Sequence, residues 1–182
     1  MNLANQFLLA MPSLAGDYFG GSLTYLCEHN EHGAMGLIVN RPSNLSLAEL
    51  LSQVGLNTPH SLADTTVLDG GPVAPVAGFV LHSSETAFGS SVVLNEALQM
   101  STGMDVLEAI ANDKGPTHYL VTLGYAGWDA GQLEAEIAAN VWLTVPADPT
   151  ILFELPHSQR LNAAAKTLGI DFSLISARPG QA

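Results

Sequence analysis

The clearest evidence for the fold class comes from the segment Leu23-Thr-Tyr-Leu-Cys-Glu-His-Asn-Glu-His-Gly-Ala-Met-Gly-Leu-Ile-Val39. Two apolar runs, Leu23 to Leu26 and Gly36 to Val39, flank a polar centre that contains Gly33. This pattern predicts a strand, a turn and a second strand. Because apolar residues occupy consecutive positions, we expect both strands to be buried on both faces.

The rest of the chain predicts more strands than helices. Capping residues and glycine stops predict four short helices, over 46–54, 102–114, 129–140 and 158–168. Further strands are predicted over 67–68, 79–82, 92–94, 119–123, 141–145 and 151–155. Since strands and helices do not alternate strictly, we expect an α+β fold with mixed, largely antiparallel coiled sheets and about four short helices. The chain is predicted to form one compact domain over residues 1–182, with a frayed tail at 178–182.

Composition restricts the partners and the compartment. The net charge is −12, and the five basic side chains are scattered, so direct binding to nucleic acid or to anionic lipid is not expected. Cys27 is the only cysteine, which fits a reducing compartment. The opening segment from Leu3 to Met11 does not read as a signal peptide, and no apolar run is long enough for a membrane span. These observations favour a cytoplasmic protein.

The sharpest polar cluster is the centre of the opening stretch, from Cys27 to Gly33. Two histidines and two carboxylates within it could hold a metal ion, but their spacing does not match helical zinc signatures. Neighbouring residues such as Glu28 and His29 point to opposite faces of an extended chain. A polar hairpin without a metal or cofactor is therefore the favoured interpretation.

Three other residues could have either a chemical or a purely structural role. Cys27 could act as a nucleophile with His29 or His82 as its base, but a lone cysteine in an apolar strand is more often a small buried side chain. His82 ends a strand and is read either as a site residue or as a hydrogen-bonded sheet residue. Arg41 could bind a carboxylate or phosphate group, although an internal ion pair is favoured.

Two glycine-rich stretches remain, 69–72 and 124–128, and neither matches a phosphate-binding loop or a dinucleotide fingerprint. The first is interpreted as a tight turn. The second is interpreted as a packed corner between a strand and a helix that starts at Asp129, with Tyr125 and Trp128 as core aromatics.

The order of several sequence blocks resembles the AlgH/YqgE family of bacterial proteins. These blocks are Tyr25 to Asn30, Gly33 to Pro42, Gly70 to Val73, Gly78 to His82, Asp105 to Ala111 and Gly124 to Glu134. The resemblance extends from about Asn5 to Ile175 and implies a compact α+β fold in the bacterial cytosol. It implies no reaction; the regulator label of some members refers to a genetic association with alginate production. Members often carry a basic residue before the Gly78 block, where this chain has Ala77.

Five polar residues shared with that family form the candidate binding site: Glu28, His29, Asn40, Arg41 and His82. No residue is assigned as catalytic or as a metal ligand. The favoured function is a non-enzymatic regulatory or adaptor protein that binds a protein or a small ligand, with a homodimer among its expected assemblies. The alternative is a small-molecule enzyme that uses Glu28, His29 and His82 as acid and base groups and Arg41 as an anion anchor.

Overall fold

The computed structural model describes residues 1–172, so the predicted frayed tail at 178–182 lies outside the described residues. The chain forms two compact units. Unit 1 comprises Met1–Asn40 and the chain from Ala126 onward, and unit 2 comprises Arg41–Tyr125. The prediction of one domain over the whole chain stays a prediction.

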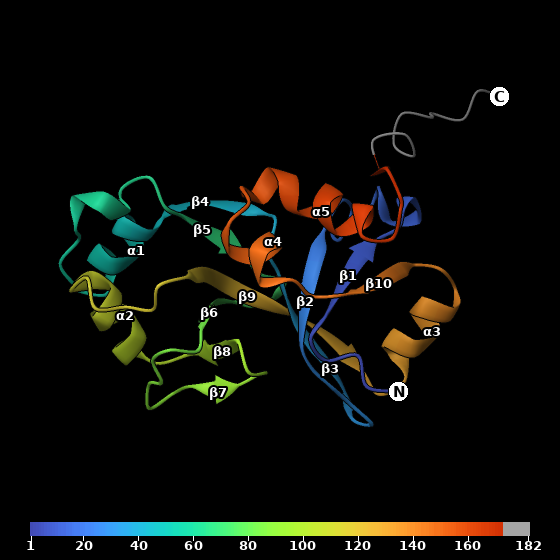
Figure 1. Cartoon of the computed structure of the whole chain (residues 1–182), viewed down its shortest axis with the longest axis horizontal. Helices are drawn as coiled ribbons and strands as arrows, with labels where there is room; N and C mark the ends of the chain where they lie inside the picture. Colours follow the sequence, from blue (N-terminus) through green and yellow to red (C-terminus); the bar gives the residue numbers. More distant parts are fainter. Residues whose placement is uncertain (173–182) are drawn as a thin grey trace. The chain divides into compact units, whose positions relative to one another are not determined.

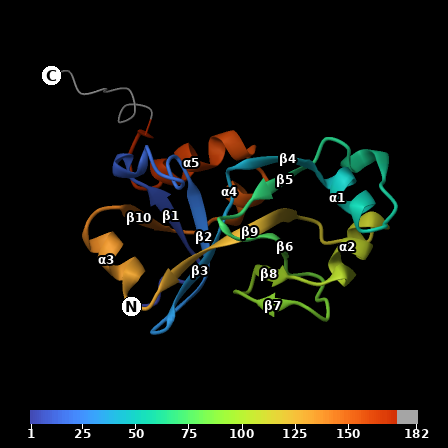
Figure 2. The ribbon, with the colours of Figure 1, turned by 180° about the vertical axis from the view of Figure 1, so that it is seen from behind.

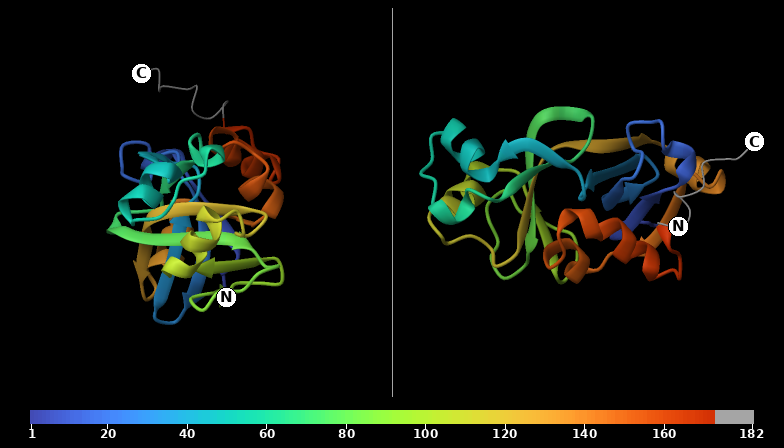
Figure 3. Two further views of the ribbon diagram at one scale, coloured as in Figure 1. Left: turned by 90° about the vertical axis from the view of Figure 1, so that its left-hand side faces the viewer. Right: turned by 90° about the horizontal axis from the view of Figure 1, so that it is seen from above.

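Unit 1 is an antiparallel sheet with helices packed on it. Its elements are β1 (Gln6–Ala10), β2 (Leu23–Asn30), β3 (Gly33–Ile38), the end of β9 (Tyr119–Asp129), α3 (Gln132–Ala138), β10 (Trp142–Pro146), α4 (Pro149–Phe153) and α5 (His157–Lys166). The strand order is β10, β1, β2, β3, β9, and each neighbouring pair is antiparallel (Figure 1). The predicted hairpin is thus confirmed as β2 and β3, with a turn at residues 31–32. Helix α5, red-orange in Figure 3, packs against β1.

The core of unit 1 contains a cluster of three aromatic rings. Trp128 of β9 and Trp142 of β10 lie edge to face, with 5.9 Å between ring centroids. Phe19 stacks on Trp128 and meets Trp142 by its edge. Offset and edge contacts of this kind are the favourable aromatic geometries. The prediction that Trp128 is a core aromatic is confirmed, since its side chain is buried.

Unit 2 is a second, mixed sheet with two helices. Its elements are β4 (Pro42–Ser46), α1 (Leu47–Gln53), a 3-10 turn (His60–Leu62), β5 (Thr66–Asp69), β6 (Val73–Ser83), β7 (Val92–Val93), β8 (Leu98–Ser101), α2 (Met104–Ala111) and the first part of β9. The strand order is β4, β5, β9, β6, β8, β7 (Figure 2). The pairing of β5 with β9 is parallel, and the other pairings of this unit are antiparallel.

Helices α1 and α2 cover the core of unit 2. The predicted capping box of α1 is confirmed: the Ser46 hydroxyl accepts from the Glu49 backbone N–H, and the Glu49 side chain accepts from the Ser46 backbone N–H. Leu47 and Leu51 of α1 and Val106 and Ile110 of α2 then pack into one apolar cluster with Val80 of β6. The spacing of these residues by three or four positions places them on one face of each helix.

The α+β class with largely antiparallel sheets is confirmed, but the prediction over 151–155 is wrong. This segment was expected to be a strand and instead belongs largely to α4, which brings the described α-helices to five. Asp148 caps this helix by accepting from the Thr150 backbone N–H, and Pro149 occupies the first helical position. Proline is favoured there because its fixed φ suits the first turn and its missing N–H costs no bond.

The interpretation of 124–128 as a corner is also wrong. Strand β9 continues through this stretch to Asp129, and α3 begins at Gln132 rather than at Asp129. Gly124 has a φ of 77°, and a Cβ atom there would lie 2.3 Å from the Gly71 carbonyl oxygen. The glycine therefore permits a local twist and a close approach of two backbones inside a continuous strand.

Strand β1 was not predicted, although it is central to unit 1. Phe7, Leu8 and Leu9 are completely buried, and β1 pairs with β10 on one side and β2 on the other. Within residues 1–172, no helix is long and apolar enough to cross a membrane.

Candidate functional site

Glu28 and His29 lie on opposite faces of β2. Glu28 is exposed and accepts a hydrogen bond of 3.0 Å from the Asn30 side chain. His29 is buried, as the alternation of a strand requires when its neighbour faces solvent. The two side chains therefore do not share one face of the sheet.

Both ring nitrogens of His29 are engaged. Its Nδ1 accepts from the Leu3 backbone N–H at 2.9 Å, so the proton of the neutral ring belongs on Nε2. Nε2 contacts a carboxylate oxygen of Glu134 on α3. The pKa of Glu134 is lowered, first by its own backbone N–H and then by His29. His29 thus ties the start of the chain and α3 to β2.

Asn40 closes the other end of the same strand. Its Oδ1 accepts from the Leu23 backbone N–H at 2.8 Å, and its Nδ2 donates to the Gly21 carbonyl at 2.9 Å. Leu23 begins β2, whereas Glu28 and His29 lie near its end, so Asn40 is separated from them along the strand.

Arg41 is the first residue of unit 2 and is partly buried. Its carbonyl accepts from the Asp69 backbone N–H at 2.8 Å, which joins the start of β4 to the end of β5. Arg41 therefore has a defined backbone position beside the connection between β5 and β6.

His82 of β6 is fully buried in a chain of hydrogen bonds. Its Nδ1 lies 2.8 Å from the Ser83 carbonyl, which can only accept, so Nδ1 carries the proton. Nε2 then accepts from the Ser101 hydroxyl at 2.7 Å, and Ser101 lies 2.7 Å from the Ser91 hydroxyl. Ser91 in turn accepts from the Phe88 backbone N–H at 2.8 Å. The arrangement holds β6, β8 and the loop before β7 together.

Cys27 lies in the same strand as the first two candidates and is buried. Burial, followed by the nearby Glu28 charge, raises the pKa of the thiol to about 12. A thiol that stays protonated is a poor nucleophile. Among residues 1–172, no three His, Cys, Asp or Glu side chains are grouped so that they could hold a metal ion.

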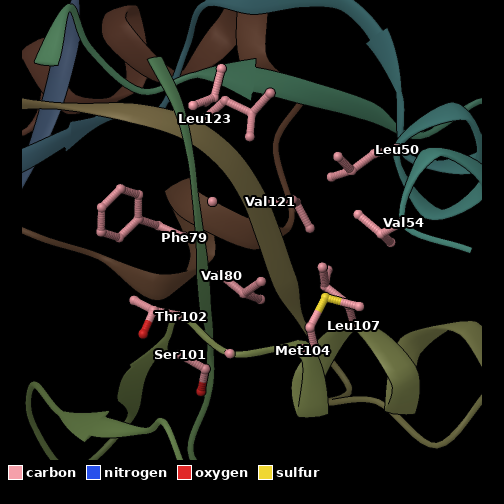
Figure 4. A pocket seen from close by; sticks show the side chains of 13 residues that line it. Leu50, Val54, Phe79, Val80, Ser101, Thr102, Met104, Leu107, Val121 and Leu123 are labelled. Atoms are coloured by element: carbon pink, nitrogen blue, oxygen red, sulfur yellow. The ribbon is translucent and has the colours of Figure 1, made fainter. Parts of the chain in front are cut away.

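Sequence reasoning missed an apolar pocket in unit 2. The pocket has a volume of about 190 Å³ and lies among α1, α2, β6, β9 and the end of β8. Its lining side chains are mainly aliphatic (Figure 4). They include Leu50, Val54, Val76, Val80, Met104, Leu107, Val121 and Leu123. We call this the unit-2 pocket.

Gly78 creates much of the space in the unit-2 pocket. Residues 76, 78 and 80 of β6 share one strand face by alternation, and Figure 4 shows the Phe79 side chain on the other side of β6 from Leu50, Val54 and Met104. A Cβ atom on Gly78 would meet only Leu123 Cδ2, at 3.9 Å. An isolated glycine inside a strand was the one signal in the sequence that could have pointed to this place.

The size and the lining of the pocket define what it can hold. An apolar cavity of about 150 Å³ accepts a benzene-sized group, whereas sites for drug-sized ligands start at about 300 Å³. The unit-2 pocket therefore fits one apolar side chain or a small apolar molecule rather than a nucleotide cofactor.

Comparisons with known proteins agree on one family. A family model described as AlgH-like matches residues 7–173. The chain is 54% identical to a UPF0301 protein of Stutzerimonas stutzeri over 182 residues, covering 99% of this chain and 96% of the relative. It is 52% identical to a UPF0301 protein of Thioalkalivibrio sulfidiphilus over 181 residues, covering 100% and 97%.

Solved structures give the same result. The solution structure of the AlgH protein from Pseudomonas aeruginosa is similar with a TM-score of 0.83 and 52% identity, covering 100% of this chain and 97% of that one. A crystal structure of a protein from Corynebacterium diphtheriae has a TM-score of 0.73 at 19% identity, covering 91% and 86%, and so shows a shared fold alone. With a family model over nearly its whole length and relatives at half identity, the chain belongs to the AlgH-like family.

Proposed function

We propose that the protein is a non-enzymatic adaptor or regulatory protein that binds a partner by holding one of its apolar groups in the unit-2 pocket. The observation that carries this proposal is an apolar pocket whose rim is also apolar and exposed. Val76 is 90% exposed, Met104 44% and Val54 38%. Apolar side chains gathered around a hollow on the surface are typical of interaction sites.

The expected gain from filling the pocket is moderate. Burying one Leu-sized side chain stabilises a complex by about 1.5–3 kcal/mol. Every 1.4 kcal/mol corresponds to about a tenfold change in affinity, so this single contact supplies roughly a tenfold to hundredfold gain. A partner needs additional contacts to bind tightly, which suits a reversible adaptor.

The polar candidates support a binding role over an enzymatic one. Both ring nitrogens of His29 and of His82 are occupied by hydrogen bonds inside the protein. A general base must lie within hydrogen-bond reach of its substrate, and both of these rings are buried. Glu28 is exposed on the face opposite His29, so these two residues do not form a ready acid and base pair.

A cytoplasmic setting and a partner other than nucleic acid are part of the proposal. The lone buried Cys27 and the net charge of −12 support them, because the first needs no oxidising compartment and the second repels polyanions. The regulator label of the family is compatible with an adaptor that acts through protein contacts.

The proposal is tested by titrating isotope-labelled protein with toluene and following its amide resonances. We expect shifts confined to residues around the unit-2 pocket. The variant Gly78→Val fills the pocket and should abolish these shifts, whereas the control Gly16→Val, where a Cβ atom meets nothing within 4 Å, should keep them. Unchanged shifts in Gly78→Val, or no shifts in the natural protein, would contradict the proposal.

A further inference from the structure

The unit-2 pocket lies beside an open edge of β6. On one side β6 pairs with β9, from Val73 and then from Gly78 to His82. On its other side β8 pairs with β6 only from Val80 to Ser83. Within residues 1–172, no strand pairs with the part of β6 from Val73 to Phe79 on that side. The backbone C=O groups of this edge, and its N–H groups except at Pro75, can pair with another extended chain.

The edge opens because β8 leaves β6 where the pocket begins. Strand β8 ends at Ser101, and Gly103 is the N-cap of α2, with Ser90 accepting from its backbone N–H at 2.9 Å. Ser90 also donates to Asp105 in the first turn of α2. This fixes α2 so that Met104 stands at the pocket rim instead of continuing the sheet (Figure 4).

A bulge shapes the same edge. The register between β6 and β9 shifts between Val73 and Gly78, because four residues of β6 lie opposite a single residue of β9. Ala74 adopts a φ of 45°, which is costly for a residue with a side chain, and Val76 is presented to solvent at the pocket rim. Bulges and strained residues of this kind are concentrated beside functional sites, where they direct a side chain.

Charge indicates what kind of chain fits this edge. Residues 41–125 contain eight carboxylates and two basic side chains, so unit 2 carries a net charge of −6. The exposed Glu108 is four residues after Met104 and so lies one helical turn away on the same side of α2. A basic segment is attracted to this surface, and a second copy of this acidic chain is repelled from it.

We propose that the partner supplies an extended segment rich in lysine or arginine, which adds a strand to the open edge of β6 and places one apolar side chain in the unit-2 pocket. This inference rests on the proposed function and specifies its partner. Backbone hydrogen bonds along the edge would supply affinity. The pocket would select the apolar side chain that points into it from the added strand. The volume of the pocket matches one such side chain.

The experiment uses short synthetic peptides that alternate lysine and threonine around one central apolar residue, with leucine, isoleucine, methionine or phenylalanine at the centre. Binding to the full chain is measured by fluorescence polarisation, and amide resonances locate the site. Three altered forms of the best peptide are compared with it. One has N-methyl groups on its backbone, one has glutamate in place of lysine, and one has a central serine.

We expect the best peptide to shift the resonances of β6 between Val76 and Phe79, and each altered form to bind about tenfold more weakly or worse. Gly78→Val should weaken the best peptide by a similar factor, while Gly16→Val should not. A thermal melt of each variant confirms that it is folded.

Other outcomes separate the two proposals. If Gly78→Val blocks the peptide but N-methylation or the exchange of lysine for glutamate has no effect, the pocket binds an apolar group and the added basic strand is refuted. If no peptide shifts β6 while toluene still binds in the pocket, the inference about the partner is likewise overturned and the proposed function stands. If neither probe reaches the pocket, both are overturned.

Discussion

Two buried histidines show how single residues organise this protein. His29 accepts a backbone hydrogen bond at one ring nitrogen and contacts Glu134 at the other, and His82 has a carbonyl at one nitrogen and Ser101 at the other. In each case the partners fix which nitrogen carries the proton. A buried imidazole whose two nitrogens are both satisfied costs little to bury and links distant segments.

Replacing the serine beside His82 tests the value of this link. In Ser101→Ala the buried Nε2 of His82 loses its donor, and an unsatisfied buried acceptor costs about 1–3 kcal/mol. We expect the free energy of unfolding, measured in urea, to fall by that amount. Ser84→Ala serves as the control, since its hydroxyl bonds an exposed carbonyl of Glu96, and a comparable loss there would contradict the argument.

Glu85 should make the protein sensitive to acid. Partial burial tends to raise the pKa of this carboxyl, but hydrogen bonds from the Thr117 backbone N–H and the Ser83 hydroxyl outweigh it and lower the pKa from 4.5 to about 2. Because the folded pKa is depressed, the stabilisation is present above about pH 4.5 and is lost as the pH falls towards 2. The loss is modest, since Glu85 is largely exposed and solvent screens it.

Urea unfolding at a series of pH values checks this expectation. Glu85→Gln should show a flatter decline between about pH 4.5 and 2 than the natural protein. Glu96→Gln, at another exposed carboxylate of unit 2, should leave the decline unchanged. Identical curves for the natural protein and Glu85→Gln would show that this carboxyl does not contribute.

At the scale of elements, two glycines in neighbouring strands have opposite roles. Gly78 of β6 faces open space, so Gly78→Val should leave the melting temperature unchanged or raise it, because valine favours a strand and gains apolar contacts. Gly124 of β9 combines a φ of 77° with the close approach of the Gly71 carbonyl. Gly124→Val should therefore destabilise the fold by more than about 3 kcal/mol. Thermal denaturation followed by circular dichroism measures the melting temperature of both variants. An equal fall in melting temperature for Gly78→Val and Gly124→Val would refute the proposed difference between the two glycines.

Elements with strong local signals were predictable. Ser46 and Glu49 predicted the start of α1, and the polar turn around Gly33 predicted the hairpin of β2 and β3. The segment 151–155 was misjudged because a short apolar run suits a strand and a buried helix equally, and the deciding signals, Asp148 and Pro149, precede it. The glycines of 124–128 predict a corner between a strand and a helix, whereas in the structure they allow one strand to pass close to another.

The candidate site was harder to predict than the fold. The polar residues chosen from the sequence are now placed individually, with His29, Asn40 and His82 in hydrogen bonds inside their units. Their role as a shared binding site stays a prediction. The unit-2 pocket was missed because aliphatic residues such as Leu50 and Leu107 read as core in a sequence, and only the missing side chain of Gly78 leaves room between them.

At the scale of the whole molecule, charge should separate two kinds of assembly. Salt screens the attraction between this acidic protein and a basic peptide, so the peptide should bind more weakly as sodium chloride rises beyond about 0.15 M. Salt also screens the repulsion between two copies of charge −12, so the expected homodimer should become stronger under the same change. Fluorescence polarisation measures the binding of the peptide, and analytical ultracentrifugation measures the formation of the homodimer. If salt weakens both or strengthens both, this electrostatic account is contradicted.

The division of the chain has a consequence for synthesis on the ribosome. Unit 2 is continuous in sequence, whereas unit 1 needs both the first forty residues and the chain after Ala126. Strand β1 leaves the ribosome before the other strands of unit 1, and one of its two partners, β10, is completed only at Pro146. Because domains tend to fold as their residues emerge, unit 2 can fold during translation before β10 is available to pair with β1. The side of β1 that pairs with β10 therefore stays unpaired in the nascent chain until β10 has been made.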